Sequence, residues 1–293
     1  QNAKTVVSDL EKVRAFITMG EKTIVSLAPA YLGIFDYDKP GQVVDALLRL
    51  GFSEVRETAE GAAYVTEAYT RLLAEGQMKN IISTCCPSVN ELVEKYYPEL
   101  VEYMAPVVSP MIAHGKLIKS MYGPDVKVVF VGPCIAKKQE AEGDDRTTGF
   151  VDAVLNFEEI ESWLQERDIS IRECEEKQPT NPDPKANRLY PVTSGVISSV
   201  LAKKKVDSYK KIFVDGIEDC REVFEDMKKG LIEGCFIEAN MCEGGCVKGP
   251  AVNKLHISKY KATMVIEEQV EKQDPAYPQL AGNIDISKHF RSE

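Results

Sequence analysis

Residues 126–131, which read Val-Lys-Val-Val-Phe-Val, form a nearly continuous β-branched and aromatic run that ends at Gly132-Pro133-Cys134. A run of this kind is typical of a strand that is covered on both faces of a parallel sheet. Six further short runs have a similar character and lie at residues 23–28, 54–58, 80–84, 153–157, 211–215 and 235–238. The sequence therefore predicts seven strands.

Longer stretches with apolar residues at helical spacing separate most of these strands. They predict helices at residues 40–50, 61–75, 90–97, 110–121, 157–167, 195–204 and 218–229. Alternating strands and helices indicate an α/β fold with right-handed crossovers. Residues 173–188 are polar and hold three Pro, so a surface loop is predicted there.

We expect two α/β lobes with mostly parallel sheets flanked by helices, and an active site in the cleft between them. The chain, residues 1–293, is expected to form a single domain whose lobes divide roughly into 1–125 and 126–293, with exchange of strands between them allowed. In open α/β sheets the reactive residues lie in loops beyond the carboxyl ends of the strands. Those loops are therefore the places to look for chemistry.

The composition is that of an ordinary globular protein, with 44% hydrophobic residues and 28% charged residues in 293. The net charge of −10 argues against nucleic-acid and anionic-membrane partners, which require a basic face. No apolar run approaches the ~18–20 residues of a membrane span. The start at Gln1 carries no signal-peptide core, so we expect a mature or trimmed terminus and a soluble, cytoplasmic protein.

The chain has eight Cys, and five of them follow predicted strands. Cys85 and Cys86 follow one strand, Cys134 follows a second, and Cys242 and Cys246 follow a third. Their wide spacing shows that any shared site is assembled by the fold and not by a local knuckle. Three strand ends are thus predicted to bring thiols to one crevice.

The other three cysteines, a disulfide and a zinc site have to be weighed against an iron–sulfur cluster. Cys174, Cys220 and Cys235 are expected to pack as small buried side chains. A disulfide between Cys85 and Cys86 is unfavourable in a reducing compartment, and zinc sites more often show C-x2-C pairs, which are absent. Several thiols with only three His in the chain favour an iron–sulfur cluster over a mononuclear metal site.

Three stretches around these thiols resemble the motifs of one family. They are residues 83–88 (STCCPS), 132–140 (GPCIAKKQE) and 241–250 (MCEGGCVKGP). They resemble the TSCCP, MPCxxKKxE and MxCxxGCxxGG motifs of the iron-only (FeFe) hydrogenases. Residues 27–30 (LAPA) and 190–196 (YPVTSGV) resemble that family's APA/APS turn and FGxTGGV stretch. The resemblance covers nearly the whole chain, in order.

The resemblance implies an H-cluster, in which a 4Fe–4S cubane is joined through one Cys sulfur to a two-iron unit. That unit bears CO, cyanide and a dithiolate bridge. Carried over position by position, Cys86, Cys134, Cys242 and Cys246 would ligate the cubane, and Cys246 would be the shared sulfur. Most of the chemistry would then belong to the cofactor, which the protein places and surrounds.

The same resemblance assigns the lining of the two-iron pocket. Ala28, Pro29, Ala30 and Pro133 would line it, and Tyr190 would pack nearby.

Polar roles are implied for three residues. Lys137 would donate a charge-assisted hydrogen bond to a cyanide ligand. Cys85 would relay protons to the bridge, a task that suits a thiol because its pKa can be tuned. Glu67 aligns with the first relay Glu of the family, with a two-residue gap in the alignment between it and Cys85.

Several positions depart from the family pattern. Gly132 and Asn240 stand where Met packs against the two-iron unit, so a roomier and more polar pocket is expected. Ala105 replaces the usual relay Ser, and Thr70 replaces the outer relay Glu. Because Ala carries no proton, we expect low activity. The tail at residues 249–250 (Gly-Pro) resembles the divergent, sensory members.

Three functions remain open at this point. The first is a hydrogenase that reversibly oxidises H2 to protons and electrons. The second is an H2-sensing regulatory protein with the same cluster, and the third is a 4Fe–4S-carrying assembly or interaction protein without the two-iron unit. Cys85, Lys137 and Cys246 favour the first two. The partners implied are H2 and protons, maturation proteins, and a ferredoxin-like electron partner or a removed flanking cluster domain.

Overall fold

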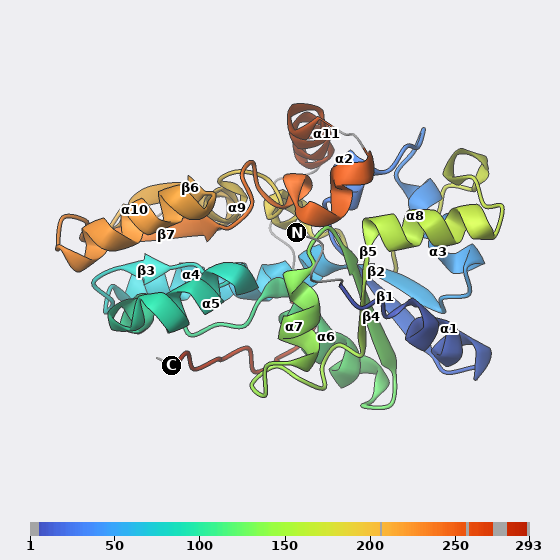
Figure 1. Ribbon diagram of the computed structural model, residues 1–293, viewed down its shortest axis with the longest axis horizontal. Helices are drawn as coiled ribbons and strands as arrows, with labels where there is room; N and C mark the ends of the chain where they lie inside the picture. The colour runs from blue at the N-terminus through green and yellow to red at the C-terminus, as the bar shows by residue number, and fades with distance from the viewer. Residues whose placement is uncertain (1–5, 206, 256–257, 272–279, 292–293) are drawn as a thin grey trace.

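The computed structural model describes residues 6–205, 207–255, 258–271 and 280–291, so the terminus at Gln1 lies outside the described residues. The strands form two separate parallel sheets (Figure 1). The first has the order β2-β1-β4-β5, with β1 Thr23–Leu27, β2 Glu54–Glu57, β4 Lys127–Gly132 and β5 Ala153–Asn156. The second has the order β3-β7-β6, with β3 Ile81–Ile82, β6 Lys210–Asp215 and β7 Cys235–Asn240. The expected fold class is confirmed, and all seven predicted strands are present.

Helices flank both sheets. In the first lobe they are α1 (Leu10–Thr18), α3 (Gly41–Arg49), α6 (Pro110–Tyr122), α7 (Ala136–Glu142) and α8 (Phe157–Glu166). Around the second sheet, α5 and α10 pack on one face, whereas α4 and α9 pack on the other. The bounds of this group are α4 Thr58–Glu75, α5 Pro87–Tyr96, α9 Gly195–Lys203 and α10 Ile217–Lys228. The short α2 (Tyr31–Ile34) contacts α11 (Lys259–Glu271).

The two sheets do not divide the chain near residue 125. Strands β4 and β5 pair with β1 in the first sheet, whereas β3 pairs with β7 in the second. Each half of the sequence therefore gives strands to both sheets, because parallel pairing requires a crossover and the long crossovers here pass between the lobes. The strand pairing is the exchange between lobes that the sequence analysis allowed for, and it crosses the rough division at residue 125.

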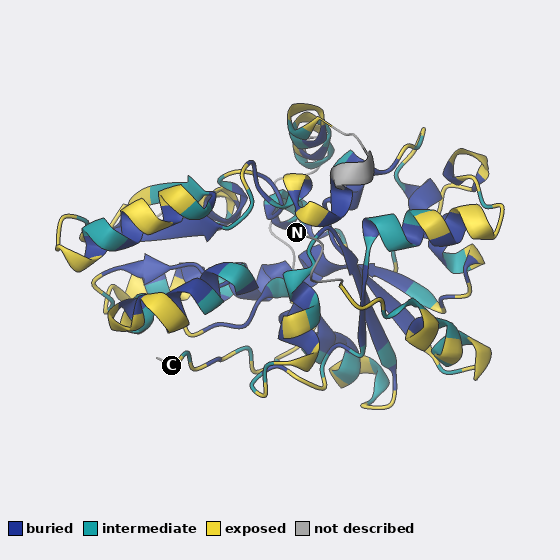
Figure 2. Cartoon of the chain, viewed as in Figure 1, coloured by how far each residue is buried: buried dark blue, intermediate teal, exposed yellow. Residues whose placement is uncertain are grey.

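Burial follows the apolar runs of the sequence. Every residue of β1 and of β7 is buried, as expected for strands that are covered on both faces (Figure 2). One core cluster surrounds the first sheet, and a smaller one lies between β7, α5 and α10. The exposed residues concentrate on the outer helices and loops (Figure 2).

Part of the predicted surface loop at 173–188 packs on the sheet. The N–H of Thr180 donates to the carbonyl of Val55 at 2.9 Å, and the N–H of Glu57 donates to Oδ1 of Asn181 at 2.7 Å. Strand β2 lies at the edge of its sheet, so its outward backbone groups need partners from elsewhere. The loop supplies them, which the polar composition did not reveal.

A buried ion pair fixes the end of this loop. Nε and Nη2 of Arg188 donate to the two carboxylate oxygens of Glu57, each at 2.7 Å. Only 12% of the Arg188 side chain and 1% of the Glu57 side chain are exposed.

Replacing Arg188 by Leu should leave the Glu57 carboxylate buried without its partner. We expect the free energy of unfolding, measured with urea, to fall by about 3 kcal/mol. Arg172→Leu is the matched control, because Arg172 pairs with Asp36 and Asp38 at the exposed surface. An equal loss in both variants would contradict a special role for the buried pair.

Candidate metal-cluster site

The carboxyl ends of both sheets point at one cavity. In the second sheet, β3 ends at Ile82 and the chain passes through Cys85 and Cys86 into α5. In the first sheet, β4 ends at Gly132 and is followed by Cys134. Pro87 occupies the first turn of α5, where a missing N–H costs nothing, so it turns the chain from strand to helix directly after the two thiols.

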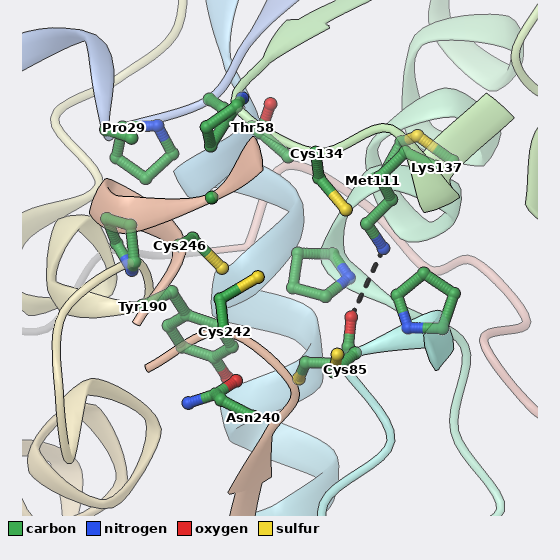
Figure 3. Close-up of a pocket in the computed structure, with 18 of the residues that line it drawn as sticks. Pro29, Thr58, Cys85, Met111, Cys134, Lys137, Tyr190, Asn240, Cys242 and Cys246 are labelled. Carbon is green, nitrogen blue, oxygen red and sulfur yellow. Dashed lines mark hydrogen bonds between the residues drawn. The ribbon is translucent and has the colours of Figure 1, made fainter. Parts of the chain in front are cut away.

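The five strand-end cysteines line this cavity, which has a volume of about 880 Å³ including its mouth (Figure 3). They are Cys85, Cys86, Cys134, Cys242 and Cys246. The structure therefore brings together thiols that lie up to 161 positions apart in the sequence, from 85 to 246. In contrast, Cys174, Cys220 and Cys235 are buried outside the lining, as expected.

The four expected ligands lie close enough to affect one another's charge. Burial raises the pKa of Cys134 to about 11 and that of Cys242 to about 12, and a neighbouring Cys86 thiolate adds to both. Burial also raises the pKa of Cys246, with further contributions from the other three. Four thiolates gathered this closely repel each other unless a cation compensates them, and iron supplies that compensation in iron–sulfur proteins.

The turn that carries Cys242 and Cys246 requires glycine. Gly244 and Gly245 have φ of +86° and +81°. A Cβ at Gly245 would also lie 2.6 Å from the carbonyl oxygen of Pro191. Only glycine combines this backbone conformation with so close an approach, so the pair sets the path between the two thiols.

The part of the cavity beside these thiols is largely apolar. The expected residues Ala28, Pro29, Ala30 and Pro133 all line it, and Met111 and Phe130 do so as well.

The additional room expected at Gly132 is absent. Side chains two positions apart on a strand share a face, and the ring of Phe130 lies 2.6 Å from where a Cβ of Gly132 would stand. Phe130 thus fills the space that a larger residue at 132 would take. The expectation of greater polarity applies only at Asn240, whose side chain lines the wall (Figure 3).

Lys137 places a buried cation beside the thiols. Its ammonium donates to Oε2 of Glu140 at 2.5 Å. It also donates to the carbonyl of Cys85 at 3.2 Å, the bond drawn in Figure 3. Burial lowers the pKa of Lys137, but the charges of Glu140 and Cys134 outweigh it, and the net pKa is raised. The ammonium therefore stays charged and faces the cavity that the thiols share.

Cys85 is not among the four expected cluster ligands, and its thiol contacts a side chain of helix α4. Its Sγ lies 3.2 Å from the hydroxyl of Tyr69 on α4, and burial raises the pKa of Cys85 to about 12. The thiol is therefore protonated at neutral pH. From Tyr69 the contacts continue to Thr84, whose hydroxyl donates to the carbonyls of Ala105 and Val107. Backbone carbonyls pass no proton onward, so this route ends there.

Glu67 does not take the place that the alignment predicts. Its carboxylate pairs with Lys203, its side chain is 44% exposed, and it is absent from the cavity lining. Thr66 and Tyr69 occupy the inward face of α4, and Glu67 points about 100° away from Thr66 around the helix. The two-residue gap before Cys85 hid this rotation.

One further residue lies in the wall of the cavity, and another lies behind it. Tyr190 lines the cavity as expected, and its hydroxyl lies 2.8 Å from Oγ1 of Thr66. Behind the wall, Glu238 accepts a hydrogen bond from the N–H of Ile197 at 2.9 Å, at the start of α9. Burial raises the pKa of Glu238 to about 7. Glu238 was not predicted as a site residue; its only signal is a charged residue within a fully buried strand.

The donor set fits a cubane with an apolar chamber beside it. Four thiols, one ammonium and a wall of Ala, Pro, Met and Phe supply the ligands and the surroundings that such a group needs. Among the described residues, no three His, Cys, Asp or Glu side chains converge as they would on a single metal ion. The ligands of a cubane stand further apart, since each binds a separate corner.

No helix in the described part of the chain is long and apolar enough to span a bilayer.

Comparisons with known proteins agree with this geometry. The family described as "Iron only hydrogenase large subunit, C-terminal domain" matches residues 21–250. Iron hydrogenase 1 of Clostridium pasteurianum is 27% identical over 89% of this chain and 57% of its own length. The periplasmic [Fe] hydrogenase large subunit of Nitratidesulfovibrio vulgaris is 28% identical over 71% of this chain and 61% of its own length.

A solved structure shares the fold. The apo [FeFe]-hydrogenase HydA1 of Chlamydomonas reinhardtii superposes with a TM-score of 0.70 at 18% identity, covering 89% of this chain and 88% of that one. The present chain spans about three-fifths of the length of the two curated relatives.

Glu238 makes stability depend on pH in a defined direction. The folded protein holds its proton up to pH about 7, whereas the unfolded chain releases it near the ordinary value of 4.5. The folded state therefore binds more protons between these values, and stability falls as pH rises. Relative to Glu238→Gln, we expect the wild-type free energy of unfolding to fall by about 2 kcal/mol from pH 5 to 7.

Urea titrations across this pH range measure the difference. Glu222→Gln serves as the control, because Glu222 is exposed and its removal should leave the wild-type slope. Parallel pH curves for wild type and Glu238→Gln would show that the buried carboxyl does not titrate in this range.

Proposed function

Because this chain belongs to the iron-only hydrogenase large-subunit family, we propose that it is a hydrogenase domain that reversibly converts H2 into two protons and two electrons. Homologues of this family carry an H-cluster, a 4Fe–4S cubane linked to a two-iron subcluster. The observation that carries the proposal is the convergence of four thiols with an apolar chamber and a buried ammonium in one cavity. A protein that carried only a cubane would need neither the chamber nor the ammonium.

In this proposal Cys86, Cys134, Cys242 and Cys246 would hold the cubane, and Cys246 would be the sulfur shared with the two-iron unit. When bound, the group supplies the site where the H–H bond is broken or formed and the first acceptor for its electrons. Ala28 and the prolines beside it exclude water from that site. Exclusion of water strengthens every electrostatic contact inside the chamber.

The charged and titratable side chains divide the remaining tasks. Lys137 offers an ammonium to anionic ligands, held in place by Glu140 and by the carbonyl of Cys85. Oε1 of Glu140 is buried and has no hydrogen-bond partner among the residues that the structure describes, so this carboxylate oxygen can accept a further hydrogen bond. Cys85, protonated at neutral pH, holds a proton at Sγ on the wall of the chamber.

A cubane held by the four thiols would supply the exit and entry for electrons. The proposal includes a ferredoxin-like electron partner or a cluster domain elsewhere in a longer protein, and maturation proteins that install the two-iron unit. The family match supports an electron-transfer partner in general terms.

Cys85→Ala tests the proposed chemistry. After maturation, we expect H2 evolution to fall by at least about 100-fold, because the group that holds a proton on the wall of the chamber has been removed. Iron content and the electron paramagnetic resonance signal of the reduced cubane should stay unchanged. Cys235→Ser is the control, because this thiol donates to the carbonyl of Glu233 away from the cavity. Unchanged turnover in Cys85→Ala would remove Cys85 from the reaction.

A further inference from the structure

A row of buried hydrogen-bonding side chains leaves the cavity on the side away from the second sheet. It starts at Thr58, which directly follows β2 and lines the cavity beside Pro29 (Figure 3). Oγ1 of Thr58 lies 2.8 Å from Oγ of Ser26 on β1. Ser26 Oγ lies 2.7 Å from Nδ1 of His114 on α6, and Nε2 of His114 lies 3.1 Å from Oε2 of Glu60 on α4.

The row is enclosed along its length and opens at both ends. Ser26 and His114 have no exposed surface, and Thr58 has 4%. At its far end Glu60 lines a second cleft of about 260 Å³, with Tyr64, Pro182, Pro184 and Leu280 among its walls. Pro182 and Leu280 are exposed, so this cleft lies at the surface. The four side chains therefore join the cluster cavity to the surface.

The protonation states of the row are set by its surroundings. Burial lowers the pKa of His114 despite the opposing effect of Glu60, so the imidazole is neutral. Burial raises the pKa of Glu60, but hydrogen bonds from His114 and from Arg56 outweigh it, so the carboxylate is charged. The nearby charge of Glu57 also acts on His114. A charged Glu60 accepts from Nε2, which leaves Nδ1 to accept from Ser26 and Ser26 to accept from Thr58.

Each group in the row therefore donates a hydrogen bond to the next one, in the direction of Glu60, which is the arrangement needed for a proton to hop along the row. We propose that Thr58, Ser26, His114 and Glu60 carry protons between the cluster cavity and the surface cleft. The proposal rests on the proposed hydrogenase function, which requires a proton route. The route through Cys85 and Tyr69 ends at the carbonyls of Ala105 and Val107, whereas this row is continuous.

The transfer balances at every step. A proton taken up at Oγ1 of Thr58 displaces the Thr58 hydroxyl proton to Ser26, and the Ser26 proton passes to Nδ1 of His114. The Nε2 proton then passes to Oε2 of Glu60, which releases it to water in the cleft. Rotation of the two hydroxyls and reorientation of the imidazole, so that its single N–H again faces Glu60, restore the starting state. Uptake of protons runs the same steps in reverse.

The first test measures proton transfer along the row without requiring catalytic turnover. The chain has three His, so selective ¹⁵N labelling isolates His114, and nuclear magnetic resonance measures exchange of its Nε2 proton with solvent. Glu60→Gln cannot accept the proton, so exchange should slow by at least about 10-fold. If the pair were only structural, the weaker amide contact would leave the exchange rate unchanged or raise it. Either of those results overturns the proposal.

The second test measures H2 evolution by the matured protein. Thr58→Val removes the hydroxyl at the cavity and keeps the volume, so turnover should fall at least about 10-fold, and Thr58→Ser should restore it. Ser26→Ala should act like Thr58→Val and leaves the Arg56–Glu60 pair intact, so it serves if Glu60→Gln does not fold. Thr23→Val is the matched control, a buried β1 residue whose hydroxyl donates to the carbonyl of Glu21.

The two tests separate the proposals. Turnover of Thr58→Val equal to that of Thr23→Val would overturn this proton route while leaving the hydrogenase assignment standing. Absence of turnover in the matured wild type would instead overturn the proposed function, and the exchange rate of His114 would still decide whether the row conducts protons.

Discussion

A parallel sheet presents the carboxyl ends of all its strands at one edge, and this chain sets two such edges against one cavity. Every feature of the site depends on that constraint. The thiols come from the ends of β3, β4 and β7, while Ala28, Pro29 and Ala30 of the apolar wall follow β1, and the buried polar row starts at Thr58 after β2. Both halves of the sequence give strands to each sheet.

The cavity combines an apolar wall with a few charged groups, and each of these is held in position by a buried ion-pair partner. Lys137 is held by Glu140, and Glu60 is held by Arg56 through two hydrogen bonds at 2.8 and 3.0 Å. In a buried setting such pairs are costly to break, so they hold their charges in place. With the proposed cluster bound, electrons would leave through the cubane, and protons through the proposed row of side chains on β1, α4 and α6.

The sequence predicts the strands well because residues 126–131 and the similar runs have no other stable place than a covered sheet. It also predicts which thiols meet, since all five follow strands. It does not predict α7, Ala136–Glu142, whose polar sequence has no apolar stripe. It places Glu67 inward because alignment across a gap cannot fix a helix rotation of 100°. The row from Thr58 to Glu60 is assembled from separate elements, so no local motif marks it.

The central claim is that this cavity holds a cubane joined to a two-iron unit. Infrared spectroscopy of the matured, anaerobic protein tests it most directly, because protein-bound CO and cyanide absorb where proteins do not. The account predicts sharp CO and cyanide bands in the wild type and their loss in Cys246→Ser. A wild-type protein that contains the cubane but shows no such bands after maturation would contradict it.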